Sequence, residues 1–165
     1  MTLLLSSLST PIGSLNLIAH EHVLLAANLS NVKALKESLS AEDSVHEIKS
    51  VAKIPVISDL INNYFDGDIS ALNAIQVRQP GAPFSQAAWK AMKKVKPGAV
   101  ISYADLAERA GSPAAVRAAG SACAKNAIVL VVPCHRIVKT GGALGNYAYG
   151  LNKNCLLYTS PSPRD

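Results

Sequence analysis

The residues with the clearest chemical potential form the Pro-Cys-His-Arg sequence at 133–136. They follow an apolar run at 128–132, rich in β-branched residues, which predicts a buried strand. Because proline cannot donate to a sheet ladder, we expect the strand to end at Pro133, with Cys134 directly after its end. A neighbouring histidine and arginine favour the thiolate, the nucleophilic form of cysteine. Free cysteine is also among the most buried residue types, so this segment alone fits a structural cysteine equally well.

The other cysteines and the histidines bear on metal binding and compartment. The three cysteines, Cys123, Cys134 and Cys155, are odd in number and widely spaced, which argues against a disulfide framework and for a reducing compartment. No pair has CxxC spacing, and the four histidines lack the spacing of zinc ligands. We therefore expect no metal site and a cytoplasmic protein, nucleoid-associated, or nuclear if the source is a eukaryote.

Composition and charge limit the class of protein. Of the 165 residues, 49% are hydrophobic and 16% are charged, so the chain can bury a core as one domain or two small ones. The formal net charge of +5 favours a polyanionic partner. The apolar start of the chain has no lysine or arginine before it and is broken by serines, unlike a signal peptide. No apolar run is long enough to span a membrane, so we expect no membrane partner.

The first half of the chain has the pattern of a small α/β domain. Residues 10–13, Thr-Pro-Ile-Gly, have turn chemistry between strand-like runs. The expected strands cover residues 2–8, 15–19, 23–29, 44–50 and 72–77, and the expected helices cover 31–39 and 54–65. A segment rich in proline and glycine at 78–83 marks a domain boundary. We therefore expect an N-terminal domain over residues 1–79 with a mostly antiparallel sheet.

The second half has the periodicity of helices, expected at 84–95, 103–110 and 113–125. A helix, a short turn and a second helix are the arrangement of helix-turn-helix DNA readers, although any helical hairpin has the same pattern. The last helix is built almost entirely from small residues, with Arg117 among them. Such a face can approach a nucleic-acid groove closely, and it can equally pack against a neighbouring helix.

Together these motifs resemble a known family. They are Ile101-Ser102-Tyr103, Gly111-Ser112-Pro113, Arg117-Ala118, Gly120, Asn126, the segment 133–138, Gly145-Asn146-Tyr147 and Gly150-Leu151. In this order and spacing the chain is similar to the O6-alkylguanine-DNA alkyltransferases, also called methylated-DNA–protein-cysteine methyltransferases. The similarity is close over residues 80–157 and looser in the N-terminal domain.

The resemblance implies a fold, a partner and a reaction. The fold would be a ribonuclease-H-like α/β N-terminal domain followed by a mainly α domain with a winged helix-turn-helix. The partner would be double-stranded DNA containing O6-alkylguanine, bound through the minor groove by a monomer that flips the damaged base out of the stack. The alkyl group, from O6-alkylguanine or, as a second candidate, from O4-methylthymine, would pass irreversibly to Cys134 in a single turnover without a cofactor.

The resemblance also implies roles for individual residues. Cys134 would be the nucleophile and His135 its base through a water, Tyr103 would rotate the target nucleotide and help protonate the leaving guanine, and Asn126 would brace the turn before the cysteine. The expected DNA contacts are Arg117, which fills the gap in the stack, with Tyr103, Ser112, Ala115, Ala118, Gly120 and Arg136. The expected walls of the base pocket are Val138, Asn146, Tyr147 and Tyr149.

The chain departs from the family pattern at its end. Relatives continue with a helix that ends in a His-Glu pair, whose glutamate orients the catalytic histidine. Here a helix over 151–157 would be followed by an atypical tail at 158–165, with two prolines and with Ser160 where the glutamate is expected. The tail is typical of a truncation or a cloning scar, and the loss of that carboxylate predicts slower reaction. Ala127 also replaces the usual proline after the asparagine, and Tyr149 replaces a small residue and could narrow the pocket.

Two other functions fit parts of the pattern. A non-catalytic or regulatory DNA-binding relative would keep the helix-turn-helix, but such relatives replace the cysteine, which this chain retains. A cysteine hydrolase would need a distant base, for which the chain offers His20, His22 and His46. Repeated turnover would identify a hydrolase, and failure of any methyl group to reach the protein would identify a binder.

Overall fold

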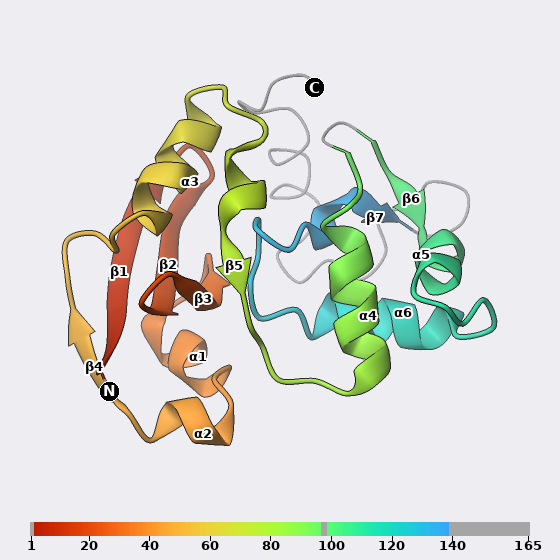
Figure 1. The fold of residues 1–165 in the computed structure, drawn as a ribbon, viewed down its shortest axis with the longest axis horizontal. Helices are drawn as coiled ribbons and strands as arrows, with labels where there is room; N and C mark the ends of the chain where they lie inside the picture. Colours follow the sequence, from red (N-terminus) through yellow and green to blue (C-terminus); the bar gives the residue numbers. More distant parts are fainter. Residues whose placement is uncertain (1, 97–98, 139–165) are drawn as a thin grey trace. The chain divides into compact units, whose positions relative to one another are not determined.

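The computed structural model describes residues 2–96 and 99–138. The chain divides into two compact units (Figure 1). Among the described residues, the first unit contains 2–80 and 127–131, and the second contains 81–126 and 132–138. In the described part, no helix is long and apolar enough to cross a membrane.

The first unit is built on a five-stranded mixed sheet (Figure 1). Its strands are β1 (Thr2–Thr10), β2 (Gly13–His20), β3 (Val23–Asn28), β4 (Glu47–Ser50) and β5 (Gln76–Val77), in the order β4-β1-β2-β3-β5. The β1-β2-β3 meander is antiparallel, while β4 and β5 run parallel to β1 and β3. The three strands predicted over 2–29 are confirmed. Their first turn forms because Gly13 adopts a φ of 116° and the Thr10 hydroxyl donates to the Gly13 carbonyl at 2.6 Å.

Helices α1 (Val32–Glu37) and α3 (Ile57–Phe65) pack against this sheet. Leu35 of α1 is fully buried in a cluster with side chains from β1, β2 and β3. The strand predicted over 44–50 is wrong at its start, because the Ser40 side chain caps a short helix, α2 (Ala41–Ser44), and β4 begins only at Glu47. Likewise the strand predicted over 72–77 begins as a 3-10 turn, η1 (Ala71–Ala74), followed by the two-residue β5.

The second unit contains three mutually packed helices, α4 (Pro83–Met92), α5 (Tyr103–Arg109) and α6 (Val116–Ala124). The Trp89 indole N–H in α4 donates to the Ala122 carbonyl in α6 at 2.9 Å. Ser102 and Asp105 form a capping box at the start of α5. Two short parallel strands, β6 (Ile101–Ser102) and β7 (Ile137–Val138), complete the described part of this unit.

Helix α6 begins later than the sequence pattern predicts. Residues 113–115 belong to the turn, since the Ala115 N–H bonds to the Ser112 carbonyl, and helical geometry starts at Val116. One face of α6 is buried, formed by Ala119, Gly120, Ala122 and Cys123. Arg117 and Ala118 are exposed on the other side. Packing therefore explains half of the small residues, and the exposed half remains available to a partner.

The strand predicted over 128–132 is not formed. Ile128 makes only an isolated bridge to Ala27, and the chain then turns, with Leu130 at a φ of 71° and the Val131 N–H bonded to the Val129 carbonyl. All five residues are nonetheless buried. Their apolar character reports burial, which a compact turn provides as well as a strand does. The chain continues into a second 3-10 turn, η2 (Cys134–Arg136).

Candidate active site

Cys134 is the first residue of η2 and is only 6% exposed. Its backbone N–H donates to the Val132 carbonyl at 2.9 Å. The Asn126 side-chain amide donates to the same carbonyl at 2.8 Å and also hydrogen-bonds the Cys134 sulfur. One asparagine thus holds both the backbone before the cysteine and the cysteine itself.

Burial controls the ionisation of this thiol. Desolvation raises the pKa of Cys134 to about 11, and the hydrogen bonds from Asn126 and from its own backbone partly oppose that rise. Burial also raises the pKa of Cys123, on the packed face of α6, and the charge of Cys134 adds to that rise. The described side chains therefore favour the thiol form of Cys134, while the side chain of His135, one of the two neighbours expected to favour the thiolate, lies outside the described residues.

This raised pKa predicts the pH profile of Cys134. Since the pKa lies above the ordinary value, the thiolate is the minor form up to about pH 11, and its fraction grows about tenfold for each pH unit below that. Alkylation of Cys134 by iodoacetamide, followed by peptide mass mapping, should therefore accelerate continuously from pH 7 to pH 10. A rate that levels off near pH 8 would contradict the raised pKa.

Tyr103 and the cysteine segment are brought into register by the small sheet of the second unit. Tyr103 directly follows β6, and β6 pairs with β7, which directly follows η2. The Tyr103 side chain is 8% exposed. Pairing of Ile101 with Ile137 fixes the start of α5 beside the chain that leaves Cys134.

Arg136 does not lie where a DNA contact was expected. It is 8% exposed, and its Nη1 donates to the Val95 carbonyl at 2.9 Å, just after α4. A buried guanidinium must satisfy its donors within the protein, and this bond ties η2 to the end of α4. We therefore assign Arg136 a structural role.

The remaining predicted DNA contacts lie on α6 and the turn before it. Arg117 and Ala118 are exposed, while Ser112 and Ala115 in the turn are half-buried. Gly120 lies in the packed face of α6, so its small size serves helix packing. The side chains of His135 and Val138, the whole of Asn146, Tyr147 and Tyr149, and residues 151–165 with Ser160 lie outside the described residues.

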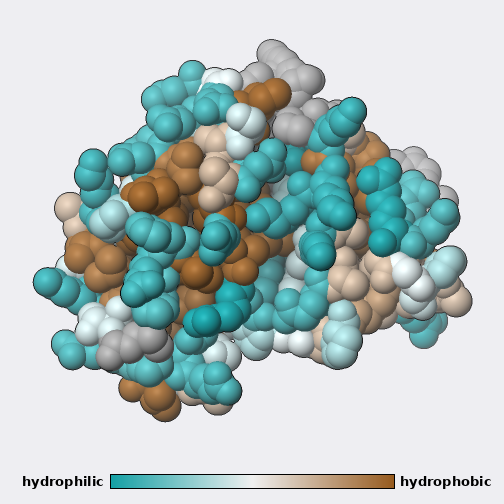
Figure 2. Space-filling view, viewed as in Figure 1, coloured by the Kyte–Doolittle hydropathy of each residue, from teal (hydrophilic) through white to brown (hydrophobic). Residues whose placement is uncertain are grey.

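A positively charged hollow lies between α4 and the end of α5. A cavity of about 550 Å³ is lined by Lys90, Lys94 and Arg109, with alanines between them. Figure 2 shows hydrophilic atoms beside weakly apolar ones over α4, as this mixture of lysines and alanines gives. These cations supply part of the positive charge that the sequence indicates for a polyanionic partner.

Sequence reasoning missed Gln79. This residue is 6% exposed, and its side-chain oxygen accepts a hydrogen bond from the Ala127 N–H at 2.8 Å. The two residues are 48 positions apart. No local pattern marks such a contact, and only its place within the boundary segment at 78–83 distinguished Gln79 in the sequence.

The chain is similar in sequence to known proteins over most of its length. Residues 83–159 match the family model described as 6-O-methylguanine DNA methyltransferase, DNA binding domain. The chain is 31% identical over 157 residues to the methylated-DNA–protein-cysteine methyltransferase of Shigella flexneri, covering 93% of this chain and 92% of the relative. It is 34% identical over 158 residues to the enzyme of the same name from Mycobacterium leprae, covering 92% and 87%.

Solved structures show the same similarity in three dimensions. The O6-methylguanine methyltransferase of Mycobacterium tuberculosis superposes with a TM-score of 0.74 at 28% identity, covering 99% of this chain and 96% of that one. A structure of Mycobacterium tuberculosis OGT in complex with DNA superposes with a TM-score of 0.76 at 28% identity, covering 94% and 91%. The similarity therefore extends well beyond the segment that contains Cys134.

Proposed function

This chain belongs to the methylated-DNA–protein-cysteine methyltransferases, and we propose that it repairs alkylated DNA by moving the alkyl group irreversibly onto Cys134. The observation that carries the assignment to Cys134 is its position: a buried thiol at the start of η2, held by the Asn126 amide. Cys123, the other described cysteine, lies within the packed face of α6.

The chemistry follows from the groups involved. The sulfur of Cys134 attacks the alkyl carbon on O6 of guanine, so that an S–C bond forms while the C–O bond breaks. His135 accepts the thiol proton, Tyr103 donates a proton to the departing guanine, and the proton on His135 then returns to Tyr103 through solvent. A soft sulfur nucleophile suits displacement at an alkyl carbon. Because a thioether has no ready hydrolytic route, each molecule reacts once, and no cofactor enters the reaction.

The partner is DNA, and we propose that it is duplex DNA with O6-alkylguanine, bound in the minor groove by a monomer. The exposed side of α6, with Arg117 and Ala118, supports this mode, because small residues permit close approach and the arginine can enter the stack. Ser112 and Ala115 would meet the backbone from the turn before α6. Asn146, Tyr147 and Tyr149 would line the base pocket, together with Val138.

We also propose a domain organisation. The α5-turn-α6 pair with the β6-β7 strands supports a winged helix-turn-helix in a C-terminal domain over 80–157. The mixed sheet with its helices supports a ribonuclease-H-like N-terminal domain over 1–79. Residues 127–131 are grouped with the first unit, although they fall within the proposed C-terminal domain in the sequence.

Mass spectrometry of the intact protein tests the proposed function directly. After incubation with duplex DNA that contains O6-methylguanine, the protein should gain the mass of one methylene, and peptide mapping should place it on Cys134. Incubation with the same duplex without the methyl group is the control. A protein of unchanged mass, or methyl release from more than one equivalent of DNA per protein, would refute the proposal.

A further inference from the structure

The loop at 127–131 leads from α6 toward Cys134 and is grouped with the first unit, not the second. Three hydrogen bonds fasten it there. The Ala27 N–H donates to the Ala127 carbonyl at 2.8 Å, and the Val129 N–H donates to the Ala27 carbonyl at 3.1 Å. The third bond joins the Ala127 N–H to the side-chain oxygen of Gln79 at 2.8 Å.

Of these three bonds, the one that Gln79 accepts involves a side chain, so a substitution can remove it. Gln79 is 6% exposed, and a buried amide group costs free energy unless it is hydrogen-bonded. Ala127 is half-buried, so its N–H is partly shielded from water. Loss of the acceptor would leave this loop N–H without its Gln79 partner, which favours a shift of the loop itself.

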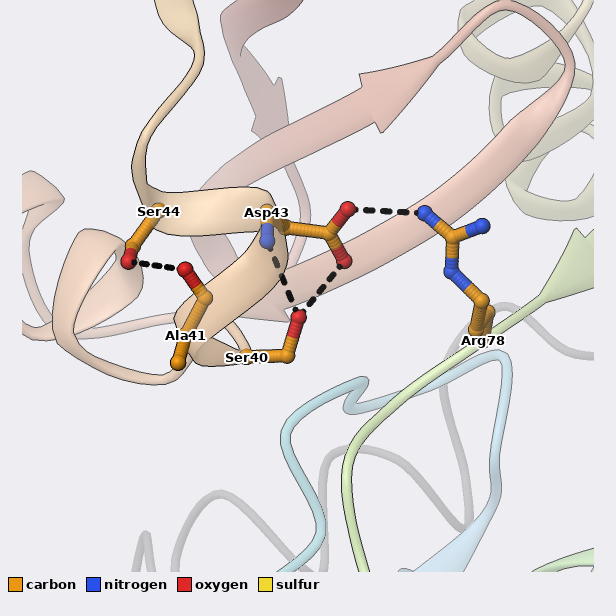
Figure 3. Close-up of polar contacts among 5 residues, drawn as sticks. All are labelled: Ser40, Ala41, Asp43, Ser44 and Arg78. Atoms are coloured by element: carbon orange, nitrogen blue, oxygen red, sulfur yellow. Dashed lines mark hydrogen bonds and ion pairs between the residues drawn. The ribbon is translucent and has the colours of Figure 1, made fainter.

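Arg78, the residue just before Gln79, is held by its backbone and by its side chain, and Figure 3 shows the side-chain contact. The Arg78 N–H donates to the Leu24 carbonyl at 3.0 Å, and its guanidinium pairs with the buried Asp43 carboxylate at 2.8 Å. The Ser40 hydroxyl donates to the other oxygen of Asp43 at 3.0 Å. The residue before Gln79 is thus anchored to β3 through its backbone and to α2 through its side chain.

Asn126 directly precedes Ala127 in the chain. Its side chain donates to the Val132 carbonyl, which links the two residues that flank the loop, and it also hydrogen-bonds the Cys134 sulfur. The Cys134 N–H bonds to the same carbonyl of Val132. A displacement of Ala127 is thus carried covalently to the residue that orients the thiol.

We propose that Gln79 is a positioning residue for alkyl transfer, acting through Ala127 and Asn126 to hold the Cys134 sulfur in line with the alkyl carbon. The inference rests on the proposed function of Cys134. It assigns a residue of the first unit a role in the reaction of Cys134. An acceptor at position 79 sets how well the nucleophile is placed, while affinity for DNA is set elsewhere, on α6.

Two substitutions at position 79 and one matched control test this inference. Gln79→Met keeps the length of the side chain but replaces the amide oxygen with a thioether, a weak acceptor, while Gln79→Glu keeps an oxygen acceptor. Gln76→Met makes the same change at an exposed glutamine on β5. Single-turnover methyl transfer is measured at saturating methylated duplex, and duplex affinity is measured in a Cys134→Ser background.

We expect the rate of methyl transfer to fall while the affinity for the duplex stays unchanged. Gln79→Met should transfer methyl about tenfold more slowly, because small misplacements of a reacting group reduce rates strongly. It should bind the duplex as the parent does, and its Ala127 amide should exchange hydrogen faster. Gln79→Glu should recover the rate, and Gln76→Met should match the wild type.

Two outcomes would overturn the inference. One is a wild-type rate in Gln79→Met with faster exchange at Ala127, which would show that the loop does not position the thiol. The other is an equal loss of rate and affinity in both position-79 variants, which would indicate a general structural role. Neither outcome touches the proposed function, which fails only if the wild type and Gln76→Met also transfer no methyl group.

Discussion

Cys134→Ala is expected to abolish methyl transfer from O6-methylguanine duplex to the protein while the variant still binds that duplex. The reason is that the substitution removes the sulfur that forms the new bond and leaves the α6 face intact. Transfer of radiolabel from DNA to protein measures the reaction, and electrophoretic mobility shift measures binding. Folding should be retained, since replacing a buried cysteine with alanine deletes one heavy atom, at a cost of about 1 kcal/mol.

The matched control for this substitution is Cys123→Ala. Cys123 is also buried, 5% exposed against 6% for Cys134, and it also lies in the second unit. Its variant should transfer the label as the wild type does. Label that persists in Cys134→Ala and disappears in Cys123→Ala would move the nucleophile to α6 and refute the assignment.

Asn126→Leu is expected to slow methyl transfer about a hundredfold, the usual loss when a donor to a reacting group is removed. Two effects combine. The hydrogen bond from Asn126 lowers the pKa of Cys134, so its removal raises that pKa further and reduces the thiolate fraction at any pH below it. The Val132 carbonyl also loses the donor in the Asn126 side chain, which weakens the link between the residues that flank the loop at 127–131.

Comparison of methyl transfer with iodoacetamide alkylation at each pH separates these two effects. If ionisation alone is affected, Asn126→Leu slows both reactions of Cys134 by the same factor, and a larger deficit in methyl transfer than in alkylation reports misplacement. Asn62→Leu, at an exposed position of α3, is the control and should behave as wild type. An Asn126→Leu rate equal to wild type across the whole range would remove Asn126 from the reactive site.

Much of the reaction chemistry could be predicted from local sequence. The type and spacing of Cys134, Asn126 and Arg117 pointed to the family, and the comparisons confirm that membership. The strands at 2–29 and the helices of the second half were also predictable, because they depend on short-range periodicity, caps and turn residues such as Gly13 and Ser102.

Two of the errors fall where distant parts of the chain meet. Residues 128–132 have the composition of a strand, yet their backbone groups bond within a turn and to Ala27. Arg136 has the charge of a DNA contact, yet it is buried on the Val95 carbonyl. In both cases the residue type predicts burial or charge, but the group that it contacts lies at least 41 positions away. Local periodicity in the sequence therefore does not reveal the contact.

The sequence by itself determined the kind of chemistry: a single thiol in a Pro-Cys-His-Arg segment, an asparagine before it, and a small-faced helix with one arginine. Only the tertiary structure decided how that thiol is held. Burial within the second unit raises its pKa, and Gln79 in the first unit anchors the loop that leads to it. Desolvation and hydrogen bonds between remote residues depend on how the folded chain packs, so they cannot be derived from neighbours in sequence.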